Sequence, residues 1–459
     1  MVEIVAPSIF REYDIRGIVG DTLTHETAEL LGLAIASEAL AHNEDKIIVA
    51  RDGRNSSPEL MRSFIIGARA TGCEVIDIGA VPTPLLYFAT HTMASTSGVM
   101  ITGSHNPPQY NGFKIVIAGD TLSGKRIQAL YQRIVHKDFA SGKGELRQAN
   151  VIEPYQQRIL RDIKIAKPLK IVIDCGHGIA GDIAPGIFSA LGCEVIPLYC
   201  EVDGDFPHHH PDPSDLANLQ DLIAAVQARK ADLGIAFDGD ADRVGLVTNK
   251  GEVIWPDRLL MRLAIDVLKQ NPGATIVFDV KCTSHLDEVI KQQGGRPLMW
   301  KTGHSLIKSK MRQEGALLAG EMSGHIYFAD RWYGFDDGIY AALRIVEILS
   351  KINHSSSQVF SALPSNISTP EIRINVPEEK KFSLVERLKK IAQFPEARVN
   401  TIDGIRIDYP DGWGLIRASN TTPALIARFE ASDIYTLERI KAAFHTEMMR
   451  VDDSLHLPF

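Results

Sequence analysis

The sequence has few cysteines, no long apolar run and no excess of positive charge. Only five of its 459 residues are cysteine and none of them form a Cys-x-x-Cys pair, which excludes a disulfide scaffold and favours small buried thiols in a reducing compartment. No apolar stretch approaches the ~18 residues that a membrane-spanning helix needs. Residues Met1–Ile4 lack the basic and apolar start of a secretion signal. We therefore expect a cytoplasmic protein that binds no membrane.

The charge balance restricts the class of ligand. Lysine and arginine total 49 and aspartate and glutamate total 57, which gives a net charge of −8. A mildly acidic chain is not expected to bind nucleic acid, and an anionic substrate would need positive charge gathered locally. The 45% hydrophobic and 23% charged residues are typical of globular protein and exclude a disordered chain.

A pattern of strand, helix, glycine-led strand, helix, strand and polar loop occurs three times. The first strands are rich in Ile and Val, as buried parallel strands are; they are Lys46–Ala50, Lys170–Asp174 and Thr275–Asp279. The second strands share five letters at 72–76 and 192–196 and are looser at 294–298. The alternation predicts βαβ units, and so three related α/β domains with mostly parallel sheets.

Each third strand of the repeat ends in an unusual polar loop. These loops are Thr102–Pro107, Asp238–Arg243 and Gly320–His325. Ligands of parallel α/β sheets bind beyond the carboxyl ends of the strands. We therefore expect the three domains to point their loops into one central cleft.

Residues 365–459 depart from the repeat and predict a small α+β domain. A strand is expected at Glu371–Val376 and a helix at Glu379–Gln393, followed by hairpin turns at Asp403-Gly404 and Asp411-Gly412. A last helix is expected to begin near a cap at Ser432 and to place four apolar residues on one face, namely Ile434, Leu437, Ile440 and Phe444. With a linker at Leu363–Ser365, the predicted domains are 1–149, 150–252, 253–364 and 365–459.

The alternating carboxylates of the second loop indicate a cation site. Asp238, Asp240 and Asp242 point the same way in extended backbone, and hard oxygen ligands suit Mg²⁺ or Ca²⁺. An EF-hand is disfavoured because its sixth and twelfth positions would be Arg243 and Asn249. Since Mg²⁺ usually combines one or two carboxylates with phosphate oxygens, we expect a phosphate partner. A solvated acidic turn is the alternative.

Two further loops indicate phosphate chemistry. Ser104 could act as a nucleophile if a base such as Lys114 activates it, although a lone serine is more often a turn former. Residues 417–422 offer one guanidinium and four side-chain donors, a suitable phosphate cradle, although an ordinary hairpin tip is about as probable from composition. Basic residues near Arg16, in 301–305 and at Lys281 add positive charge.

Six motifs in order resemble the α-D-phosphohexomutase family over essentially the whole chain. They are residues 10–17, 102–107, 238–243, 301–308, 320–325 and 417–423. Ser323-Gly324-His325 and Thr102-Gly103-Ser104 favour the bacterial phosphomannomutase/phosphoglucomutase branch, which accepts both sugars. The resemblance implies reversible transfer of a phosphoryl group between C1 and C6 of mannose phosphate and glucose phosphate, through a phosphoserine and a hexose 1,6-bisphosphate. We expect a monomer.

The resemblance also implies a role for each site residue. Ser104 would carry the phosphoryl group and share Mg²⁺ with Asp238, Asp240 and Asp242. The other implied catalytic residues are Arg16, Lys114, Arg243 and His325. The implied substrate-binding residues are Tyr13, Lys281, His304, Glu321, Ser323, His325, Arg417, Ser419, Asn420 and Thr421. The metal loop departs from many members of the family at Ala241, where they have glycine; a positive φ angle there would cost about 1–2 kcal/mol.

Two other functions compete with a mutase. A phosphatase with a phosphoserine intermediate and Mg²⁺ would need to admit water. A non-enzymatic module that binds sugar phosphates or cations would not need the hydroxyl group of Ser104.

Overall fold

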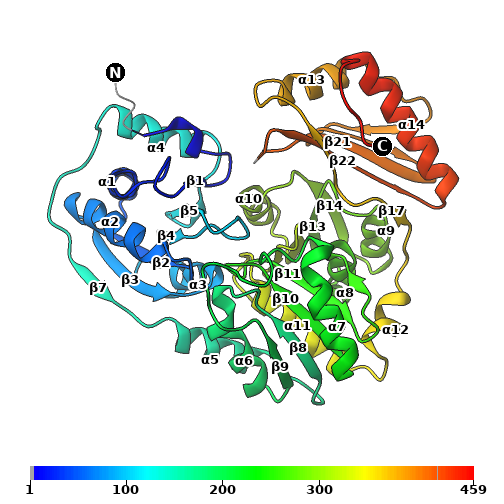
Figure 1. Ribbon diagram of the computed structural model, residues 1–459. Coiled ribbons are helices and arrows are strands. Elements are labelled where there is room, and N and C mark those ends of the chain that lie inside the picture. Colours follow the sequence, from blue (N-terminus) through cyan, green and yellow to red (C-terminus); the bar gives the residue numbers. More distant parts are fainter. Residues whose placement is uncertain (1–4, 421) are drawn as a thin grey trace.

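Three α/β domains and one α+β domain make up the computed structural model, which describes residues 5–420 and 422–459. The first domain (blue) and the last (orange to red) flank the two middle domains (Figure 1). The elements of the first repeat are η1 (Pro7–Ile9), β1 (Ile15–Ile18), α1 (His25–Ala41), β2 (Lys46–Arg51), α2 (Ser57–Ala70), β3 (Glu74–Ala80), α3 (Thr83–Thr92), β4 (Gly98–Ile101), β5 (Tyr110–Ile117), β6 (Asp120–Thr121), α4 (Lys125–Val135) and β7 (Leu146–Gln148).

The next two repeats follow the same alternation. The second contains α5 (Ile152–Asp162), β8 (Lys170–Asp174), η2 (Ile179–Asp182), α6 (Ala184–Ala190), β9 (Glu194–Leu198), η3 (Leu216–Leu219), α7 (Gln220–Arg229), β10 (Leu233–Phe237), β11 (Val244–Thr248) and β12 (Val253–Ile254). The third contains α8 (Pro256–Gln270), β13 (Thr275–Asp279), α9 (His285–Gln292), β14 (Arg296–Trp300), α10 (His304–Glu314), β15 (Leu318–Gly320), β16 (Ile326–Phe328), α11 (Gly338–Ser350) and α12 (Ser356–Ser361).

The three sheets share one strand order. The orders β3-β2-β4-β5, β9-β8-β10-β11 and β14-β13-β15-β16 each contain three parallel strands followed by one antiparallel strand. The two strands that share five letters, β3 and β9, pair in the same register with the first parallel strand of their sheets. Lys46 lies opposite Glu74 and Lys170 opposite Glu194, and each pair forms an ion pair. The predicted internal repeat is therefore confirmed.

The position of the polar loops follows from this strand order. In each sheet the third parallel strand turns back into the antiparallel strand, so the connecting loop lies at the carboxyl edge of the parallel strands. The loops also touch one another. Ser104 Oγ donates to Asp238 Oδ2, and Arg243 forms an antiparallel bridge with His325.

The fourth domain is an antiparallel sheet covered by two helices. Its elements are β17 (Ile367–Ser368), β18 (Ile372–Asn375), α13 (Lys381–Ile391), β19 (Arg398–Asn400), β20 (Ile405–Tyr409), β21 (Gly412–Ala418), β22 (Ala424–Ala431) and α14 (Ile434–Val451). Both helices contribute to one apolar core with the sheet. The hairpin between β20 and β21 forms as predicted, but its turn residues are Pro410 and Asp411, one position before the predicted Asp411-Gly412, because Gly412 already pairs with Tyr409.

Two details of the predicted last helix were wrong. The N-cap is Asp433, whose carboxylate accepts from the backbone N–H groups of Tyr435 and Thr436, rather than Ser432. Leu437, Ile440 and Phe444 are buried, but Ile434 is 50% exposed. Ile434 is the first helical residue and does not join the apolar core that the other three share.

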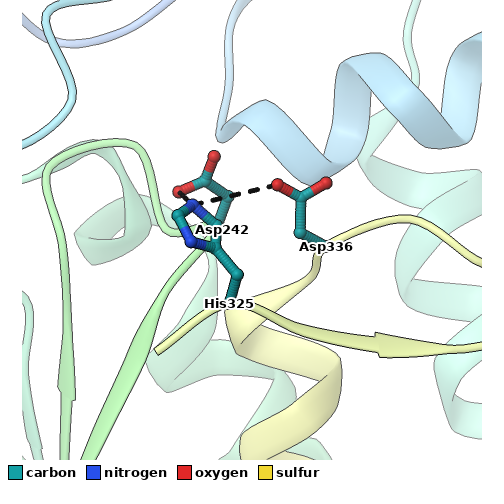
Figure 2. Close-up of side chains that lie close together, drawn as sticks. All are labelled: Asp242, His325 and Asp336. Atoms are coloured by element: carbon teal, nitrogen blue, oxygen red, sulfur yellow. Dashed lines mark ion pairs between the residues drawn. The ribbon is translucent and has the colours of Figure 1, made fainter. Parts of the chain in front are cut away.

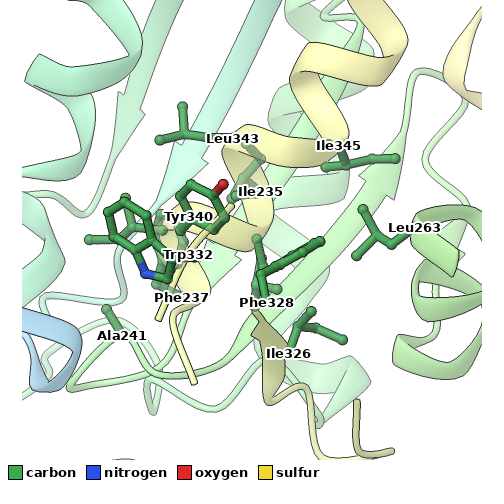
Figure 3. Packing of buried hydrophobic residues seen from close by; sticks show 14 of the residues in the cluster. Ile235, Phe237, Ala241, Leu263, Ile326, Phe328, Trp332, Tyr340, Leu343 and Ile345 are labelled. Atoms are coloured by element: carbon green, nitrogen blue, oxygen red, sulfur yellow. The ribbon is translucent and has the colours of Figure 1, made fainter. Parts of the chain in front are cut away.

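The largest apolar core joins the first three repeats and reaches the acidic loop. Ala241 belongs to this core and is fully buried, close to Phe237 and the stacked rings of Trp332 and Tyr340 (Figure 3). Its φ is +59°, so this position does require left-handed backbone. The methyl group that makes this conformation unfavourable is thus packed in the core.

We predict that Ala241→Gly changes the free energy of unfolding by less than about 1 kcal/mol. Glycine relieves about 1–2 kcal/mol of left-handed strain. It also loses about 0.8 kcal/mol of methyl burial and about 0.5–1 kcal/mol of backbone entropy. Urea unfolding of both proteins in Mg²⁺-free buffer measures the difference. A change above 2 kcal/mol in either direction would contradict this balance.

Candidate active site

The loop that carries Ser104 is held from behind by a buried arginine. Ser104 lies in left-handed backbone at φ +49° and is 4% exposed. Arg54 donates to the carbonyl oxygens of Ser104 and Asn106, at 2.7 and 2.5 Å, and also to those of Pro107 and Tyr110. These contacts fix the path of the loop. Strained backbone of this kind persists only where its surroundings impose it.

The hydroxyl group of Ser104 faces the acidic loop. Ser104 Oγ donates to Asp238 Oδ2 at 2.8 Å. His105 Nδ1 lies 3.2 Å from Ser104 Oγ. Behind the loop, Asp52 accepts from Thr102 Oγ1 and from the backbone N–H of Gly103. The side chain of Ser104 therefore points toward the carboxyl end of β10, which Asp238 follows.

The acidic loop balances its negative charge with one buried lysine. Lys114, on β5, donates to Asp240 Oδ2 at 2.6 Å and to Asp242. Burial alone would lower the pKa of Lys114, but the two aspartates raise it. Burial alone would likewise raise the pKa of Asp242, yet Lys114 and His325 hold it well below its usual value. Lys114 is therefore charged in the folded protein.

Two arginines flank the same site. Arg243 donates through Nε to Asp238 at 3.0 Å and through Nη1 to Asp212 at 3.2 Å, and its Nη2 has no hydrogen-bond partner among the residues that the structure describes. Arg16, on β1, contacts Asp14 and Asn106. Burial raises the pKa of Asp238 to about 7; Asp240 adds to this rise and Arg243 opposes it.

The loop of the third repeat places a histidine between two carboxylates. His325 Nε2 lies 3.3 Å from Asp242 and 3.9 Å from Asp336 (Figure 2). Burial alone would lower the pKa of His325, but Asp242 raises it above its usual value. The neighbouring His304 is buried beside Lys308, and both influences lower its pKa. The pKa values of the two rings are thus shifted in opposite directions, although the ring centroids are only 5.8 Å apart.

Glu321, in the same loop, already has two protein donors. It accepts from the backbone N–H of Gly303 at 2.6 Å and from Tyr327 Oη at 2.5 Å. Ser323 Oγ lies 2.9 Å from His325 Nδ1. Both side chains line the cavity described below.

The fourth domain supplies a second positive centre. Arg417, on β21, donates through Nε to Asp403 at 3.0 Å, whereas its buried Nη2 has no hydrogen-bond partner within residues 5–420 and 422–459. Asn420 bonds to Tyr13, which in turn donates to the carbonyl of Thr302 at 2.7 Å. Ser419 accepts from the backbone N–H of Thr422, and Thr421 lies outside the described residues. Lys281 pairs with Glu371 at 2.6 Å.

One cavity of about 290 Å³ collects these side chains from all four domains. The sequence-predicted residues that line it are Tyr13, Arg16, Ser104, Lys114, Arg243, Lys281, His304, Glu321, Ser323, His325, Arg417, Ser419 and Asn420. Asp238, Asp240 and Asp242 are fully buried and lie outside this lining set. Each of the four domains thus contributes at least one cationic side chain to the cavity. The carboxylate cluster lies against Ser104, whose Oγ donates to Asp238.

The carboxylate cluster fits a divalent cation. One oxygen each of Asp238, Asp240 and Asp242 lies within 4.8 Å of the others. Among the described residues, Asp240 Oδ1 is buried without a hydrogen-bond donor. Buried carboxylate oxygens normally have a partner, and a hard cation such as Mg²⁺ would supply one.

We predict that Mg²⁺ stabilises the chelator-treated protein. A ligand that binds only the folded state at 100 times its dissociation constant adds about 2.7 kcal/mol to the free energy of unfolding. Thermal unfolding with EDTA and then with excess Mg²⁺ measures this shift. Asp238→Asn is expected to reduce the response, whereas the exposed Asp453→Asn should retain it. An equal shift in all three proteins would place the cation elsewhere.

Four supporting residues were missed by sequence reasoning. Asp52 and Arg54 hold the Ser104 loop, Asp212 pairs with Arg243, and Asp336 faces both His304 and His325. Asp212 lies in a proline-flanked loop that also contains three consecutive histidines. Asp52 and Arg54 could be recognised in the sequence only as polar residues that follow β2, the first parallel strand. That position does not predict which groups they contact.

Across residues 5–420 and 422–459, no helix combines the length and apolar character needed to cross a lipid bilayer.

Comparison with known proteins identifies relatives along the whole chain. Models of phosphoglucomutase/phosphomannomutase α/β/α domains I, II and III match residues 7–141, 153–251 and 255–367, and the model of the C-terminal domain matches 371–447. A Pseudomonas aeruginosa phosphomannomutase/phosphoglucomutase is 60% identical over 98% of both chains. A Neisseria meningitidis phosphoglucomutase is 51% identical over 96% of both chains.

Solved structures agree with these relatives. A crystal structure of a phosphoglucomutase/phosphomannomutase family protein from Burkholderia thailandensis has a TM-score of 0.96 and 48% identity. The match covers 99% of this chain and 100% of that one.

Proposed function

The chain belongs to the phosphoglucomutase/phosphomannomutase family, and on that premise we propose that it moves a phosphoryl group reversibly between C1 and C6 of mannose phosphate and glucose phosphate. The observation that carries the proposal is the single cavity that contains both the Ser104 hydroxyl and the guanidinium of Arg417. A hexose phosphate has two ends, one that reacts and one that must be held. The cavity offers one site for each.

We assign the reacting end to Ser104. A phosphoryl group on Oγ would pass to the free hydroxyl of the bound sugar phosphate, which gives a hexose 1,6-bisphosphate and frees the serine. The bisphosphate would then reverse its orientation and return its other phosphoryl group to Oγ. Arg16, Lys114 and Arg243 surround this position with positive charge, and phosphoryl transfer depends mainly on positioning and charge stabilisation.

Mg²⁺ is the proposed cation of the acidic loop. Asp238, Asp240 and Asp242 would hold it together with an oxygen of the Ser104 phosphate. When bound, it would neutralise charge that develops on the transferring group. Lys114 is the protein's own counter-charge at the same carboxylates.

His325 is the proposed proton carrier for the sugar hydroxyl. Of the three histidines in the described lining of the cavity, it is the one whose pKa is raised, since Asp242 stabilises its charged form against the effect of burial. Asp336 lies 3.9 Å from the same Nε2 atom that contacts Asp242. Glu321, Ser323 and His304 are the proposed partners of the sugar's hydroxyl groups.

Arg417, Ser419, Asn420, Thr421 and Lys281 are the proposed clamp for the end that does not react. The Nη2 of Arg417 has no hydrogen-bond partner in the described part of the chain, which supports this assignment because a buried guanidinium donor requires an acceptor. Tyr13 would join this end through its contact with Asn420. We propose that the protein acts as a monomer.

Direct assay of both sugars tests the proposed function. Mannose 1-phosphate and glucose 1-phosphate should both be converted to the 6-phosphates, at comparable rates, with hexose 1,6-bisphosphate as activator. Peptide mapping should find the phosphoryl group only on Ser104. Release of inorganic phosphate as the main product would instead favour a phosphatase, and binding without turnover would favour a non-enzymatic module.

We predict that Arg417→Ala raises KM about 10- to 150-fold. The change removes a charged hydrogen bond to the held phosphate, worth about 1.5–3 kcal/mol. Ser104 should still accept label from hexose 1,6-bisphosphate supplied in excess. Steady-state kinetics with glucose 1-phosphate measure the effect. The exposed Arg439→Ala is the matched control, since its partner Asp411 lies outside the cavity.

A further inference from the structure

Two cysteines lie side by side behind the acidic loop. Cys175 follows β8 and Cys200 follows β9, two parallel neighbours in which Asp174 lies opposite Leu198. Their Sγ atoms are 3.5 Å apart. Cys175 is fully buried, whereas Cys200 is partly exposed. The sequence had indicated only small buried thiols, so this pairing across two strands is a product of the fold.

The two thiols differ in acidity. The hydrogen bond between the two sulfur atoms is the largest influence on Cys200 and lowers its pKa, although burial opposes this. The same bond raises the pKa of Cys175 well above its usual value, and burial adds to the rise. Cys200 is thus both the more accessible and the more acidic thiol. A nucleophilic cysteine with a second thiol beside it is the usual arrangement of a redox-sensitive pair.

We propose that Cys175 and Cys200 form a reversible disulfide when the protein meets a hydroperoxide. The Cys200 thiolate attacks the terminal peroxide oxygen, the O–O bond breaks, and the departing alkoxide, or hydroxide in the case of hydrogen peroxide, takes up a proton to become an alcohol or water. The resulting sulfenic acid is then attacked by the sulfur of Cys175; the S–O bond breaks and the oxygen leaves as water with the Cys175 proton. The two thiols lose two electrons and the peroxide gains them. A dithiol reductant reverses the reaction.

Closing the pair requires a movement of the surrounding chain. A disulfide bond is about 2.05 Å long, so the sulfur atoms must approach by about 1.5 Å. The loop after Cys175 has little freedom, because Gly178 donates back to the carbonyl of Cys175 at 2.7 Å. On the other side, a Cβ at Gly181 would lie 1.9 Å from the carbonyl oxygen of Cys200. Both cysteines therefore contact the segment 178–181, so a movement of either cysteine displaces it.

That segment leads directly to the acidic loop. Ile179 donates its backbone N–H to the carbonyl of Gly239 at 3.1 Å, and a Cβ at Gly178 would lie 2.9 Å from the Cα of Gly239. Gly239 stands between two of the three loop aspartates, and a Cβ there would meet the carbonyl oxygen of Ser104 at 2.3 Å. A shift at Cys175 is thus passed to the proposed metal ligands and to Ser104.

The disulfide is expected to lower activity about 10- to 100-fold, since a displacement of about 1 Å at reacting groups has effects of this size. This consequence rests on the proposed function, whereas formation of the disulfide does not. The two parts can therefore be measured separately.

Titration of the reduced protein with hydrogen peroxide tests the disulfide. Two of the five thiols should disappear, the intact mass should fall by two hydrogen atoms, and dithiothreitol should restore both. Cleavage at Asp182, Glu194 and Glu201 separates Cys175, Cys193 and Cys200, so the linked peptides can be identified. Cys193 directly precedes β9, and Cys193→Ser should still lose two thiols, as the natural protein does. Cys200→Ser and Cys175→Ala should form no disulfide and lose no pair of thiols.

The outcomes distinguish the disulfide from its effect. Over-oxidation of Cys200 without a link to Cys175, or equal thiol loss in Cys200→Ser, would overturn the proposed modification. A disulfide that leaves activity unchanged would overturn the proposed transmission to the acidic loop, as would equal loss of activity in Cys200→Ser. Reduced protein without mutase activity would refute the proposed function, while the thiol count would still decide the disulfide.

Discussion

Replacing Ser104 by alanine is expected to abolish turnover of glucose 1-phosphate and mannose 1-phosphate. The proposed mechanism stores the phosphoryl group on Ser104 Oγ. The other hydroxyl group of the 102–107 loop belongs to Thr102, and its Oγ1 donates a hydrogen bond to Asp52, so it does not replace Ser104. Loss of a covalent nucleophile reduces kcat by on the order of 10⁴-fold or more. Coupled assays of glucose 6-phosphate formation measure the effect.

The fold of this variant should remain intact. Alanine removes one hydrogen bond to Asp238, whose carboxylate still accepts from Arg243, and it leaves the loop contacts of Arg54 with backbone oxygens unchanged. The circular dichroism spectrum and the Mg²⁺-dependent stabilisation should therefore resemble those of the natural protein. Ser123→Ala, in an unrelated loop, is the matched control. Substantial turnover or labelling of Ser104→Ala would refute the phosphoserine mechanism and leave a direct transfer or another acceptor.

Replacing Lys114 by methionine is expected to have the largest effect on stability. Lys114 is the buried cation between Asp240 and Asp242, and those aspartates are fully buried. Removing one partner of a buried ion pair leaves an uncompensated charge and costs about 3–5 kcal/mol. Urea unfolding in the presence of EDTA measures the loss. Addition of Mg²⁺ should recover part of it, because a cation at the carboxylates restores positive charge to the cluster.

A surface ion pair provides the control for this variant. Lys46 pairs with Glu74 at 3.2 Å and is partly exposed, so Lys46→Met is expected to cost less than about 1 kcal/mol. Equal losses for the two variants would show that Lys114 does not neutralise the cluster. A loss in Lys114→Met that Mg²⁺ leaves unchanged would place the cation away from these aspartates.

The repeat in the sequence predicted most of the architecture because parallel strands have a simple local signature. Strands buried on both faces are continuous runs of Ile and Val, so Lys170–Asp174 and Thr275–Asp279 were recognised to the residue. The repeated five letters at 72–76 and 192–196 became strands with the same register. Short-range signals were less reliable at the ends of elements, as the cap of the last helix and the exposed Ile434 show.

The sequence by itself determined the three repeats, the acidic loop, Ser104 and the family resemblance, since each depends on residues close together in the chain. Only the tertiary structure decided that Arg54 holds the Ser104 loop, that Asp336 faces His325 and that Cys175 meets Cys200. These contacts join segments 11 to 50 residues apart along the chain, and their geometry follows from strand order and loop packing. A side chain's partner across such a distance has no signature of its own in one sequence, because burial and charge pairing are properties of the folded surroundings.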